Sequence, residues 1–484
     1  MSEPVVHQSH IDGRWQDAAD HVDVRNPSDW SDIIARVPAL APETIRAGMT
    51  TARRGAKIWG ATNALARGQV LYRAAAILRE RQPALAELLA RENGKTLAEA
   101  TGEVGKAAEF FEFYGGMARL PYGDLIHDAR PATITTVQHV PVGVVLAITP
   151  WNDPLLTPAR KLAPALAAGN AVVLKPASDT PVIALELTRA LLDAGLPPEV
   201  ITTVTGRARD IAALLVDAPE IDAITFTGST EVGLDLQRSV AGRNQRIQCE
   251  MGGKNAAIVL ADADLELAAQ TIAAAGFGQG GQRCTATSRV LVESRVADQF
   301  VARLVELAGA ITAGPSLEPG VALGPLVSKG HQSEVLAHID RARDEGAAIR
   351  VGGTQGDGDV LAKGCYVLPT VVDDVTADMK IWRDEVFGPV IAVLRVDSLD
   401  EAIDLANASE YGLSAALFTT SLAATHSFLR DIETGQAAVN LPTSGWDVHH
   451  PFGGFKLSGS SFKEQGLEAL HFYTRTKTCA VRAV

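Results

Sequence analysis

Short apolar runs alternate with longer segments of helical periodicity through the first half of the chain. Residues 142–148, 171–174 and 223–227 are mostly apolar and predict buried strands, whereas 155–168 and 181–194 place apolar side chains at helical spacing. Strands that alternate with helices pair in parallel and carry helices on both faces of the sheet. This half therefore predicts an α/β domain with a doubly wound sheet, in which ligands bind beyond the carboxyl ends of the strands.

The second half repeats this pattern and predicts a second α/β domain. A strand at 256–260 is followed by a helix at 265–277 and a strand at 289–292. Further helices and strands are expected at 300–311, 335–345, 349–352, 390–394, 399–408 and 415–419.

Segments outside these two domains predict helices that cover the first sheet and a β arm. Residues 44–59, 66–93 and 96–117 are rich in Ala, Leu, Arg and Glu and predict helices that cover the first sheet. Residues 133–139 and 471–481 alternate like strands but carry little hydrophobic bulk. We expect these two strands to project from the body and pair with another subunit, which predicts a homo-oligomer.

Composition excludes several classes of partner. The 484 residues include 44 basic and 57 acidic ones, and the net charge of −13 argues against a nucleic acid partner. No stretch reaches the apolar length of a membrane span, and no signal-peptide pattern opens the chain, so we expect a cytoplasmic protein without a membrane partner. The four cysteines show no metal or disulfide spacing, which predicts reduced thiols and no metal site.

One of these cysteines has an unusual setting. Cys284 follows the Gly-rich segment 278–281, between the helix expected at 265–277 and the strand expected at 289–292. A thiolate attacks carbonyl carbon, and Arg283 with nearby backbone N–H groups would favour that form over the thiol. A small buried structural residue is the commoner role for an arbitrary cysteine, so the neighbouring motifs must decide.

Polar residues follow the strands of the first sheet, where ligands are expected. Lys175 directly follows a buried apolar run, which is an unfavourable place for a charge unless it meets an anion or a sugar hydroxyl. The glycine-bracketed turn at 228–233 opens a helix whose free N–H groups could hold a phosphate. An ordinary helix start, capped by Ser229 or Thr230, explains this turn equally well.

Cys284, Glu250 and Asn152 supply the groups that thiol-mediated oxidation of a carbonyl requires: a nucleophile, an activator of water or thiol, and a donor to an oxyanion. Each of these residues lies in one of seven motifs that follow one another along almost the whole chain. The motifs are at 149–152, 174–177, 226–229, 250–254, 281–284, 385–389 and 451–454. With these motifs the chain resembles the NAD(P)-dependent aldehyde dehydrogenases, and most of all the branch that includes 2-oxoglutarate semialdehyde dehydrogenases.

The resemblance implies a subunit of three parts. Residues 1–120 and 142–250 would form the cofactor-binding domain, and 251–452 the catalytic domain. Residues 121–141 and 469–484 would form a small β oligomerisation arm, in a homodimer or homotetramer. The active site would lie in the cleft between the two large domains.

The resemblance also implies a mechanism that ends in a carboxylic acid. Cys284 would attack the aldehyde, and the Asn152 side-chain amide and the Cys284 backbone N–H would hold the thiohemiacetal oxygen. After hydride transfer, Glu250 would activate the water that cleaves the thioester, rather than allow transfer to coenzyme A. Lys175 would assist as part of the catalytic centre.

For the cofactor, NAD or NADP, the resemblance implies a set of contact residues around the first sheet. Lys175 and Glu385 would hold the two riboses, Trp151 and Phe387 the adenosine and nicotinamide sides, and Ser229 the pyrophosphate. Ile148, Thr149 and Gly228 belong to the same set. Ser178 stands where many NAD-preferring relatives have a glutamate, and the missing charge favours NADP, although the neighbouring Asp179 weakens that inference.

The substrate is expected to be a small aldehyde with a distal carboxylate. Arg160 would pair with this carboxylate, as in similar semialdehyde dehydrogenases, or it could be a structural ion-pair partner. Asp153 predicts a polar tunnel, and Trp446 an apolar or stacking wall. The alternatives are an aromatic-aldehyde dehydrogenase, with Phe111 or Phe113 in its tunnel, and a non-catalytic protein on the same scaffold.

Overall fold

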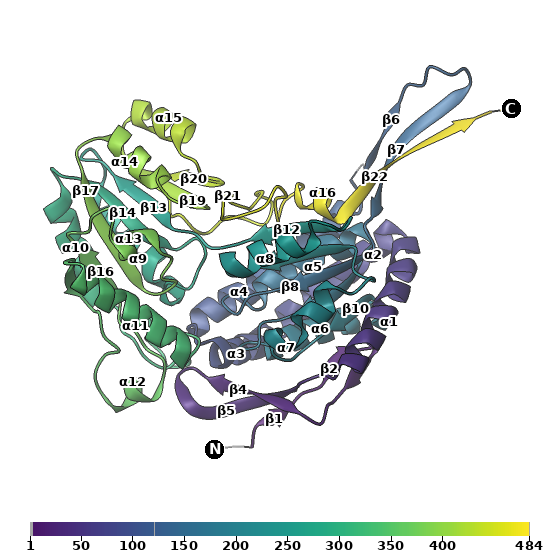
Figure 1. The fold of residues 1–484 in the computed structure, drawn as a ribbon, viewed down its shortest axis with the longest axis horizontal. Coiled ribbons are helices and arrows are strands. Elements are labelled where there is room, and N and C mark those ends of the chain that lie inside the picture. Colours follow the sequence, from purple (N-terminus) through teal and green to yellow (C-terminus); the bar gives the residue numbers. More distant parts are fainter. Residues whose placement is uncertain (1–2, 121, 484) are drawn as a thin grey trace.

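The computed structural model describes residues 3–120 and 122–483, which form two α/β bodies side by side and a β arm that projects from one of them (Figure 1). The first body is built on a parallel five-stranded sheet in the order β10-β9-β8-β11-β12. Its strands are β8 (Val144–Ile148), β9 (Ala171–Lys175), β10 (Ile201–Thr203), β11 (Ala223–Thr227) and β12 (Arg246–Glu250).

The strand order of this sheet reverses between β8 and β11. The carboxyl ends of these strands, at Ile148 and Thr227, therefore flank the crevice where doubly wound sheets bind ligands. The helices that connect the strands are α5 (Leu156–Ala168), α6 (Val182–Asp193), α7 (Ala208–Val216) and α8 (Thr230–Val240). These elements confirm the α/β prediction for the first half of the chain.

Helices cover both faces of the first sheet. Val145 and Ala147 pack against α5 and α6 and against three N-terminal helices, α2 (Ala64–Glu80), α3 (Gln82–Asn93) and α4 (Leu97–Met117). The alternate residues Val144 and Leu146 pack against α1 (Pro42–Ala61), α7 and α8. This alternation is the two-residue period of a strand buried on both sides.

The single helix expected at 66–93 is wrong, because the structure has two helices there. α2 ends at Glu80, and α3 begins at Gln82 with Pro83 in its first turn. Proline has no N–H to continue the ladder of a preceding helix, but it fits the first turn of a new one. The N-terminal strands are β1 (Val5–Val6), β2 (Ser9–Ile11), β3 (Arg14–Gln16), β4 (His21–Asn26) and β5 (Asp29–Pro38).

The second body contains a seven-stranded sheet in the order β15-β16-β17-β14-β13-β19-β20, in which only the edge strand β15 runs antiparallel to its neighbour. Its strands are β13 (Asn255–Val259), β14 (Thr287–Glu293), β15 (Ala348–Val351), β16 (Thr370–Asp373), β17 (Val390–Val396), β19 (Ser414–Phe418) and β20 (Gln436–Val439). β16 and β20 were missed in the sequence, whereas β15, which is equally short, was predicted at 349–352.

Helices also cover both faces of the second sheet. One face packs against α9 (Leu265–Phe277) and α10 (Ala297–Gly309). The other packs against α11 (Lys329–Asp344), α13 (Lys380–Arg383), α14 (Leu399–Asn407) and α15 (Leu422–Asp431). The short α12 (Asp359–Lys363) lies outside this core, and β18 (Tyr411–Gly412) pairs with β21 (Phe455–Lys456).

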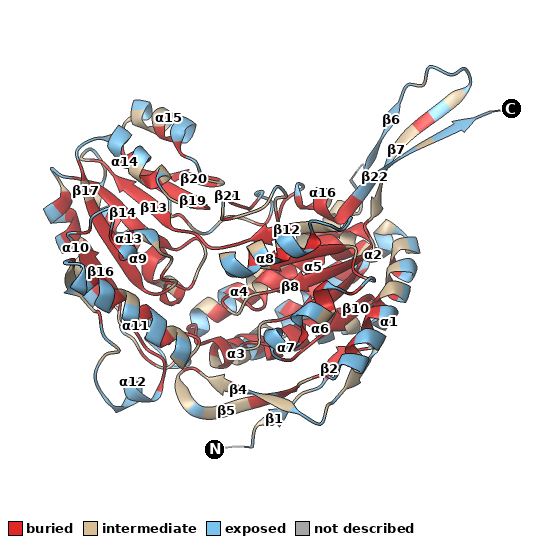
Figure 2. Ribbon diagram, in the orientation of Figure 1, coloured by how far each residue is buried: buried red, intermediate tan, exposed pale blue. Residues whose placement is uncertain are grey.

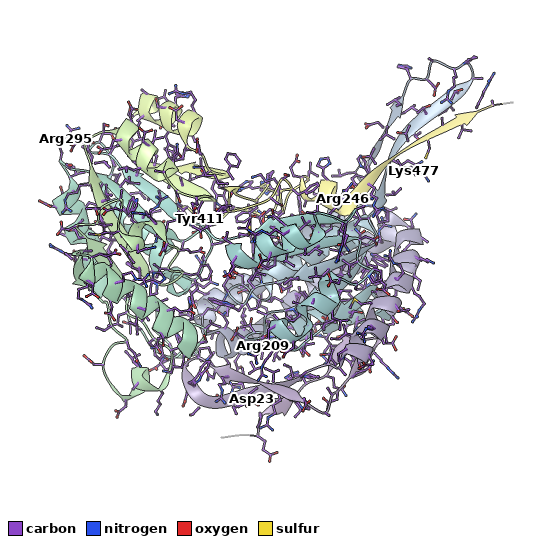
Figure 3. All side chains as sticks on the ribbon, in the orientation of Figure 1. Asp23, Arg209, Arg246, Arg295, Tyr411 and Lys477 are labelled. Atoms are coloured by element: carbon purple, nitrogen blue, oxygen red, sulfur yellow. The ribbon has the colours of Figure 1, made fainter. Side chains whose placement is uncertain are left out.

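The arm is a three-stranded antiparallel sheet, β22-β7-β6. β6 (Gly123–Ile126) and β22 (Thr474–Arg482) flank β7 (Thr133–Pro141), so the two predicted strands pair with each other. The strand predicted at 471–481 starts three residues too early, because α16 (Ala469–Tyr473) precedes it. Arg246 anchors the base by donating to the carbonyl oxygens of His471 at 2.9 Å and Thr474 at 2.5 Å, and Lys477 lies farther out (Figure 3).

Most of the arm is exposed, in contrast to the two bodies (Figure 2). Leu125, Ile134 and Val481 are 76%, 62% and 69% exposed. The pairing of Val481 with Ile134, and of Leu125 with Thr136, places these three apolar side chains on one face of the arm. In the part of the chain that the structure describes, no helix is long and apolar enough to span a membrane.

Candidate active site

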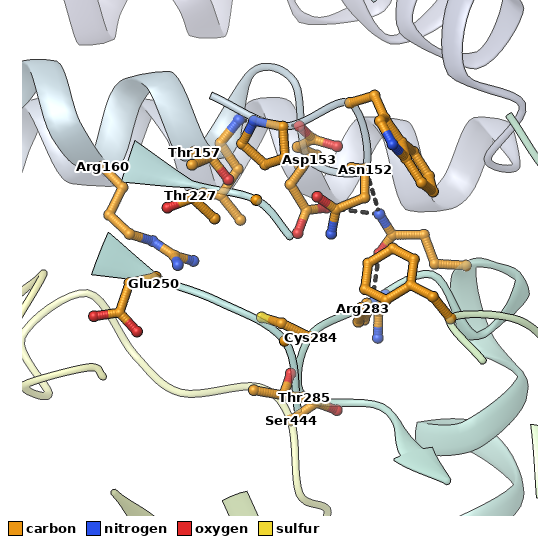
Figure 4. Close-up of a pocket in the computed structure, with 18 of the residues that line it drawn as sticks. Asn152, Asp153, Thr157, Arg160, Thr227, Glu250, Arg283, Cys284, Thr285 and Ser444 are labelled. Carbon is orange, nitrogen blue, oxygen red and sulfur yellow. Dashed lines mark hydrogen bonds between the residues drawn. The ribbon is translucent and has the colours of Figure 1, made fainter. Parts of the chain in front are cut away.

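A cavity of about 590 Å³ lies between the two bodies and is lined by residues of both. Figure 4 shows a close-up of it. The predicted site residues that line the cavity are Trp151, Asn152, Asp153, Arg160, Gly228, Ser229, Glu250, Cys284, Glu385, Phe387 and Trp446. Four others do not line it and lie at or just after the ends of β8 and β9, namely Ile148, Thr149, Lys175 and Ser178.

The loop that carries Cys284 is fixed by a glycine and an asparagine. Gly281 has a φ of +66°, and a Cβ at this position would collide with the carbonyl oxygen of Gly388. Asn255 Nδ2 donates to the carbonyl oxygens of Cys284 and Ala286, each at 2.8 Å. The thiol is therefore presented to the cavity by a constrained turn.

The Cys284 thiol is a weak acid in this setting. Burial raises the pKa of Cys284 to about 12, and Arg160 is the main influence that opposes the rise. Arg160 therefore influences the sulfur from α5, while Arg283, which was expected to favour the thiolate, donates from its Nε to the side-chain oxygen of Gln279. Attack by this sulfur therefore requires a base that removes its proton.

Glu250 provides a carboxyl group with a free oxygen at the carboxyl end of β12. The residue is 2% exposed, and its Oε1 accepts a hydrogen bond from Gln248 Nε2 at 2.9 Å. Among the described residues, nothing donates to its Oε2. Burial and the nearby Glu464 raise the pKa of Glu250 well above its ordinary value, so the carboxyl group holds its proton more tightly than an exposed glutamate does.

Asn152 is held in place from both ends. Its Nδ2 donates to the carbonyl oxygen of Gln282 at 3.0 Å. Its own backbone carbonyl accepts hydrogen bonds from Lys95 Nζ at 2.8 Å and from Gln279 Nε2 at 2.9 Å. One of the two N–H groups of the Asn152 amide remains for an oxygen in the cavity.

Arg160 forms an ion pair within the protein and also lines the cavity. It donates to Glu464 Oε2 at 3.2 Å, so it is an ion-pair partner. Its guanidinium also lies over the ring of Phe452 at 4.9 Å and lines the cavity (Figure 4). Its Nε is buried and has no hydrogen-bond partner among the described residues, which leaves a donor unsatisfied in the site.

Asp153 makes this part of the cavity polar, as predicted. Its Oδ1 accepts from Gln279 Nε2 at 2.6 Å and forms an ion pair with Lys95 Nζ at 3.1 Å. Although burial opposes its charge, Lys95 and Gln279 hold the pKa of Asp153 below its ordinary value.

The end of β9 carries a buried cation without a counter-charge in direct contact. Lys175 is 4% exposed, and its Nζ donates to the carbonyl oxygen of Pro176 at 2.5 Å. Burial lowers the pKa of Lys175 to about 8. Thr149, which is bonded through its N–H to the Lys175 carbonyl at 3.1 Å, has a buried hydroxyl with no partner among the described residues. Both groups are suited to hydroxyls of a ligand.

Three aromatic side chains and the carboxyl group of Glu385 line another part of the cavity. The rings of Trp151 and Phe387 are 5.4 Å apart, and His331 Nε2 lies 2.8 Å from the Phe387 carbonyl oxygen. Glu385 Oε1 accepts from the Gly253 N–H at 2.9 Å, and burial raises the pKa of Glu385 to about 7. These residues could hold the flat rings and the hydroxyls of a dinucleotide.

The turn at 228–233 also leaves its polar groups available. Ser229 makes no side-chain capping bond to α8, so the capping role considered for it is absent. A Cβ on Gly228 would press against the ring of Phe226, which explains why only glycine fits. The free N–H groups at the start of α8 can therefore face a phosphate.

Of the aromatic residues considered for the substrate tunnel in the sequence, Trp446 lines the cavity, whereas Phe111 and Phe113 do not. Phe111 is fully buried in the core, and Phe113 packs beside that core, so neither lines the cavity. Trp446 does line it, with its Nε1 donating to the Thr443 carbonyl at 3.1 Å. Within residues 3–120 and 122–483, no group of three or more His, Cys, Asp or Glu side chains is arranged to hold a metal ion.

Sequence reasoning did not assign roles to several residues that line the cavity or hold its side chains in place. Lys95, Gln279 and His331 line the cavity, and Glu464 pairs with both Arg160 and Lys161. No local pattern distinguishes these residues from surface side chains. The one available signal was the stretch 464–466, which was noted for its resemblance alone.

Comparisons with known proteins agree with this geometry. The profile of the aldehyde dehydrogenase family matches residues 15–479. The alpha-ketoglutaric semialdehyde dehydrogenase of Bacillus subtilis (strain 168) is 38% identical over 484 residues, which are 100% of this chain and 99% of the relative. The alpha-ketoglutarate semialdehyde dehydrogenase of Haloferax volcanii is 39% identical over 474 residues, 97% of this chain and 98% of the relative.

A solved structure extends the likeness to three dimensions. The betaine aldehyde dehydrogenase from Staphylococcus aureus in complex with NAD+ superposes with a TM-score of 0.95 at 32% identity, over 98% of this chain and 94% of that one. The family profile, the relatives and this structure all cover nearly the full length. This chain therefore belongs to the aldehyde dehydrogenase family.

Proposed function

We propose that this NAD(P)-dependent aldehyde dehydrogenase oxidises a small semialdehyde with a distal carboxylate through covalent intermediates on Cys284. The observation that carries the proposal is the meeting of Cys284, Glu250 and Asn152 in one cavity between the two bodies. A nucleophile, a buried carboxyl group with a free oxygen and an amide donor are the groups that this reaction requires.

The first step is the attack of the Cys284 sulfur on the aldehyde carbon. Because the pKa of the thiol is about 12, its proton must leave as the C–S bond forms, and Glu250, which lines the same cavity and has a free carboxyl oxygen, would take it, directly or through water. The carbonyl oxygen gains the negative charge of a thiohemiacetal. The free N–H of the Asn152 amide and the Cys284 backbone N–H stabilise that charge.

The later steps use the same residues. When bound, the nicotinamide supplies the acceptor for the hydride of the former aldehyde carbon. Once Glu250 has passed the thiol proton to solvent and is ionised again, it takes a proton from water as the water oxygen attacks the thioester carbon. The C–S bond breaks, and the Cys284 sulfur and a carboxylic acid are released.

The residues beside the cavity fit a dinucleotide. Lys175, the unpartnered Thr149 hydroxyl and Glu385 would hold ribose hydroxyls, and the N–H groups after Gly228 would hold the pyrophosphate. Ser178 Oγ donates to the Gly206 carbonyl at 3.1 Å and brings no charge to this region. We therefore propose that the enzyme accepts NADP as well as NAD.

The substrate proposal rests on Arg160. This cation lines the cavity next to Cys284, and it has a buried Nε without a partner among the described residues. A carboxylate would satisfy this donor and bring a counter-charge. Two relatives that cover nearly the full chain are named alpha-ketoglutaric and alpha-ketoglutarate semialdehyde dehydrogenases, and such semialdehydes carry a carboxylate.

The domain roles follow the same logic. Residues 1–120 and 142–250 would bind the cofactor, and 251–452 would carry the thiol. Residues 121–141 and 469–484 would form an arm that pairs subunits in a homodimer or homotetramer, since its apolar face at Leu125, Ile134 and Val481 is exposed in the single chain.

A substrate panel tests the proposal. We expect higher kcat/KM for succinic and 2-oxoglutarate semialdehydes than for benzaldehyde, and we expect Arg160→Leu to lower the first two selectively. Cys284→Ala should abolish the acyl-enzyme that mass spectrometry detects in the parent. Equal rates for benzaldehyde would favour an aromatic-aldehyde dehydrogenase, and a parent without any acyl-enzyme would favour a non-catalytic protein.

A further inference from the structure

We propose that Arg283 is a second specificity-determining residue, which binds the distal carboxylate of the substrate together with Arg160. The inference rests on the proposed function and adds a residue to it. Arg283 lines the cavity, and Figure 4 shows the two arginines on opposite sides of Cys284. Arg160 reaches the thiol from α5, whereas Arg283 immediately precedes it in the chain.

Gln279 holds Arg283 in one orientation. Both hydrogens of the Gln279 amide are used, because its Nε2 donates to the Asn152 carbonyl at 2.9 Å and to Asp153 Oδ1 at 2.6 Å. The Gln279 oxygen must therefore face the other way, where it accepts from Arg283 Nε. This bond uses one edge of the guanidinium and leaves its end, with Nη1 and Nη2, for a ligand.

Arg283 forms no direct ion pair within the protein. Among the described residues, no carboxylate oxygen lies within ion-pair distance of its guanidinium. Arg283 helps to lower the pKa of Asp153, but that carboxylate is already engaged by Lys95 at 3.1 Å and by Gln279. The positive charge at the end of Arg283 is therefore available to an anion in the cavity.

The two arginines differ in how much charge they can offer. Arg160 is paired with Glu464 at 3.2 Å, so part of its charge is offset. Arg283 has no such partner in the described part of the chain, and its free end has the planar shape that matches the two oxygens of a carboxylate. A carboxylate between the two would therefore gain more from Arg283 than from Arg160 alone.

Selectivity measurements on the full-length enzyme test this inference. With saturating NAD+, kcat/KM is measured for succinic semialdehyde and for butyraldehyde, which has the same carbon chain without the carboxylate. We expect Arg283→Gln to lower the ratio of the two values by about tenfold or more, the effect of one lost charge-assisted hydrogen bond. Arg283→Lys should restore part of the ratio, and Arg295→Gln, at a remote exposed arginine, should leave it unchanged.

A reaction without cofactor provides an independent readout. Iodoacetate and iodoacetamide differ mainly in charge, and the ratio of their alkylation rates at Cys284 reports how strongly the site attracts a carboxylate. We expect this ratio to fall in Arg283→Gln. Both rates are measured on the same protein sample, so an error in protein concentration does not change the ratio.

The outcomes separate this inference from the proposed function. If Arg160→Gln lowers both ratios and Arg283→Gln changes neither, the inference is overturned and the proposed function stands. If neither variant changes the ratios, the site does not recognise a distal carboxylate, and both the inference and the proposed substrate class are overturned. If the two effects are non-additive in the double variant, both arginines contact one carboxylate, as we propose.

Discussion

Glu464 raises the pKa of Glu250, although the two carboxyl groups come from segments more than two hundred residues apart. Glu464 lies on the C-terminal segment and is held by Lys161 and Arg160. Burial opposes its charge, but these two cations keep the pKa of Glu464 below its ordinary value, so it stays ionised beside Glu250. One carboxylate therefore keeps the other protonated up to a higher pH.

Glu464→Gln should move the pH dependence of thioester hydrolysis. Without the neighbouring negative charge, the pKa of Glu250 falls, because Lys161 and Arg160 remain and favour its ionised form. Glu250 acts as a base only when ionised, so the rise in rate with pH should occur at lower pH in the variant. The measurement is the pH profile of single-turnover acid release, and an unshifted limb would contradict the coupling.

The reactivity of Cys284 toward a neutral reagent should depend on Arg160. Since the pKa of the thiol is about 12, alkylation of the cofactor-free protein by iodoacetamide should still rise with pH above 9. Arg160→Gln removes the main opposing cation, so the thiol becomes a weaker acid and alkylation at pH 8 should slow down. Mass spectrometry measures the rate, Cys284→Ala is the blank, and an unchanged rate would remove Arg160 from this role.

Ser178→Glu should shift cofactor preference toward NAD. A carboxylate near Lys175 would repel a 2′-phosphate, and we expect the NADP-to-NAD ratio of kcat/KM to fall by about tenfold or more, as for a like-charge contact of a few kcal/mol. Ser178→Gln is the matched control, since it adds similar bulk without charge. Equal ratios in the two variants would show that charge at this position does not select the cofactor.

Gly281→Ala should destabilise the active-site loop. Its φ of +66° strains any other residue, and the added Cβ would collide with the Gly388 carbonyl, so we expect a loss of about 1–3 kcal/mol or more. Gly102→Ala is the control, because its Cβ would meet no atom within 4 Å and a helix gains about 0.5–1 kcal/mol from the change. Urea unfolding of both variants measures the difference, and equal stabilities would contradict the prediction.

Ile134→Lys should weaken subunit association. The side chain is 62% exposed and shares one face of the arm with Leu125 and Val481, where a partner subunit would bury it. Analytical ultracentrifugation should show a smaller species than for the parent protein. Val360→Lys, at a 52% exposed apolar residue on α12, serves as the control, and an identical mass for both variants would contradict the arm's role.

The fold was predictable where the apolar residues of a segment follow the spacing of a helix or a strand from end to end. The helix expected at 265–277 and the strand expected at 223–227 match α9 and β11 to the residue, because each is largely buried and has a clear apolar pattern. Pattern reasoning failed at boundaries that depend on single residues, such as the break before Pro83, and it missed β16.

The site was predictable only where a side chain meets the ligand. Cys284, Glu250 and Asn152 stand in motifs, and the structure brings them to one cavity. The residues that hold them could not be found, because Lys95 reaches the Asn152 carbonyl from 57 positions away along the chain. The influence of Arg160 on the thiol could not be found for the same reason, since this cation is distant from Cys284 in the sequence.

The stretch between Phe452 and β22 connects the active-site cavity with the arm. It pairs with the end of β12 at Gly459, carries Glu464 to its cations, and then continues directly through α16 into the outer strand of the arm. A displacement of β22 would be transmitted through α16 to Glu464, the carboxylate that raises the pKa of Glu250. In the assembly proposed above, a contact between subunits at the arm would thus be joined through one continuous segment to the active-site cavity.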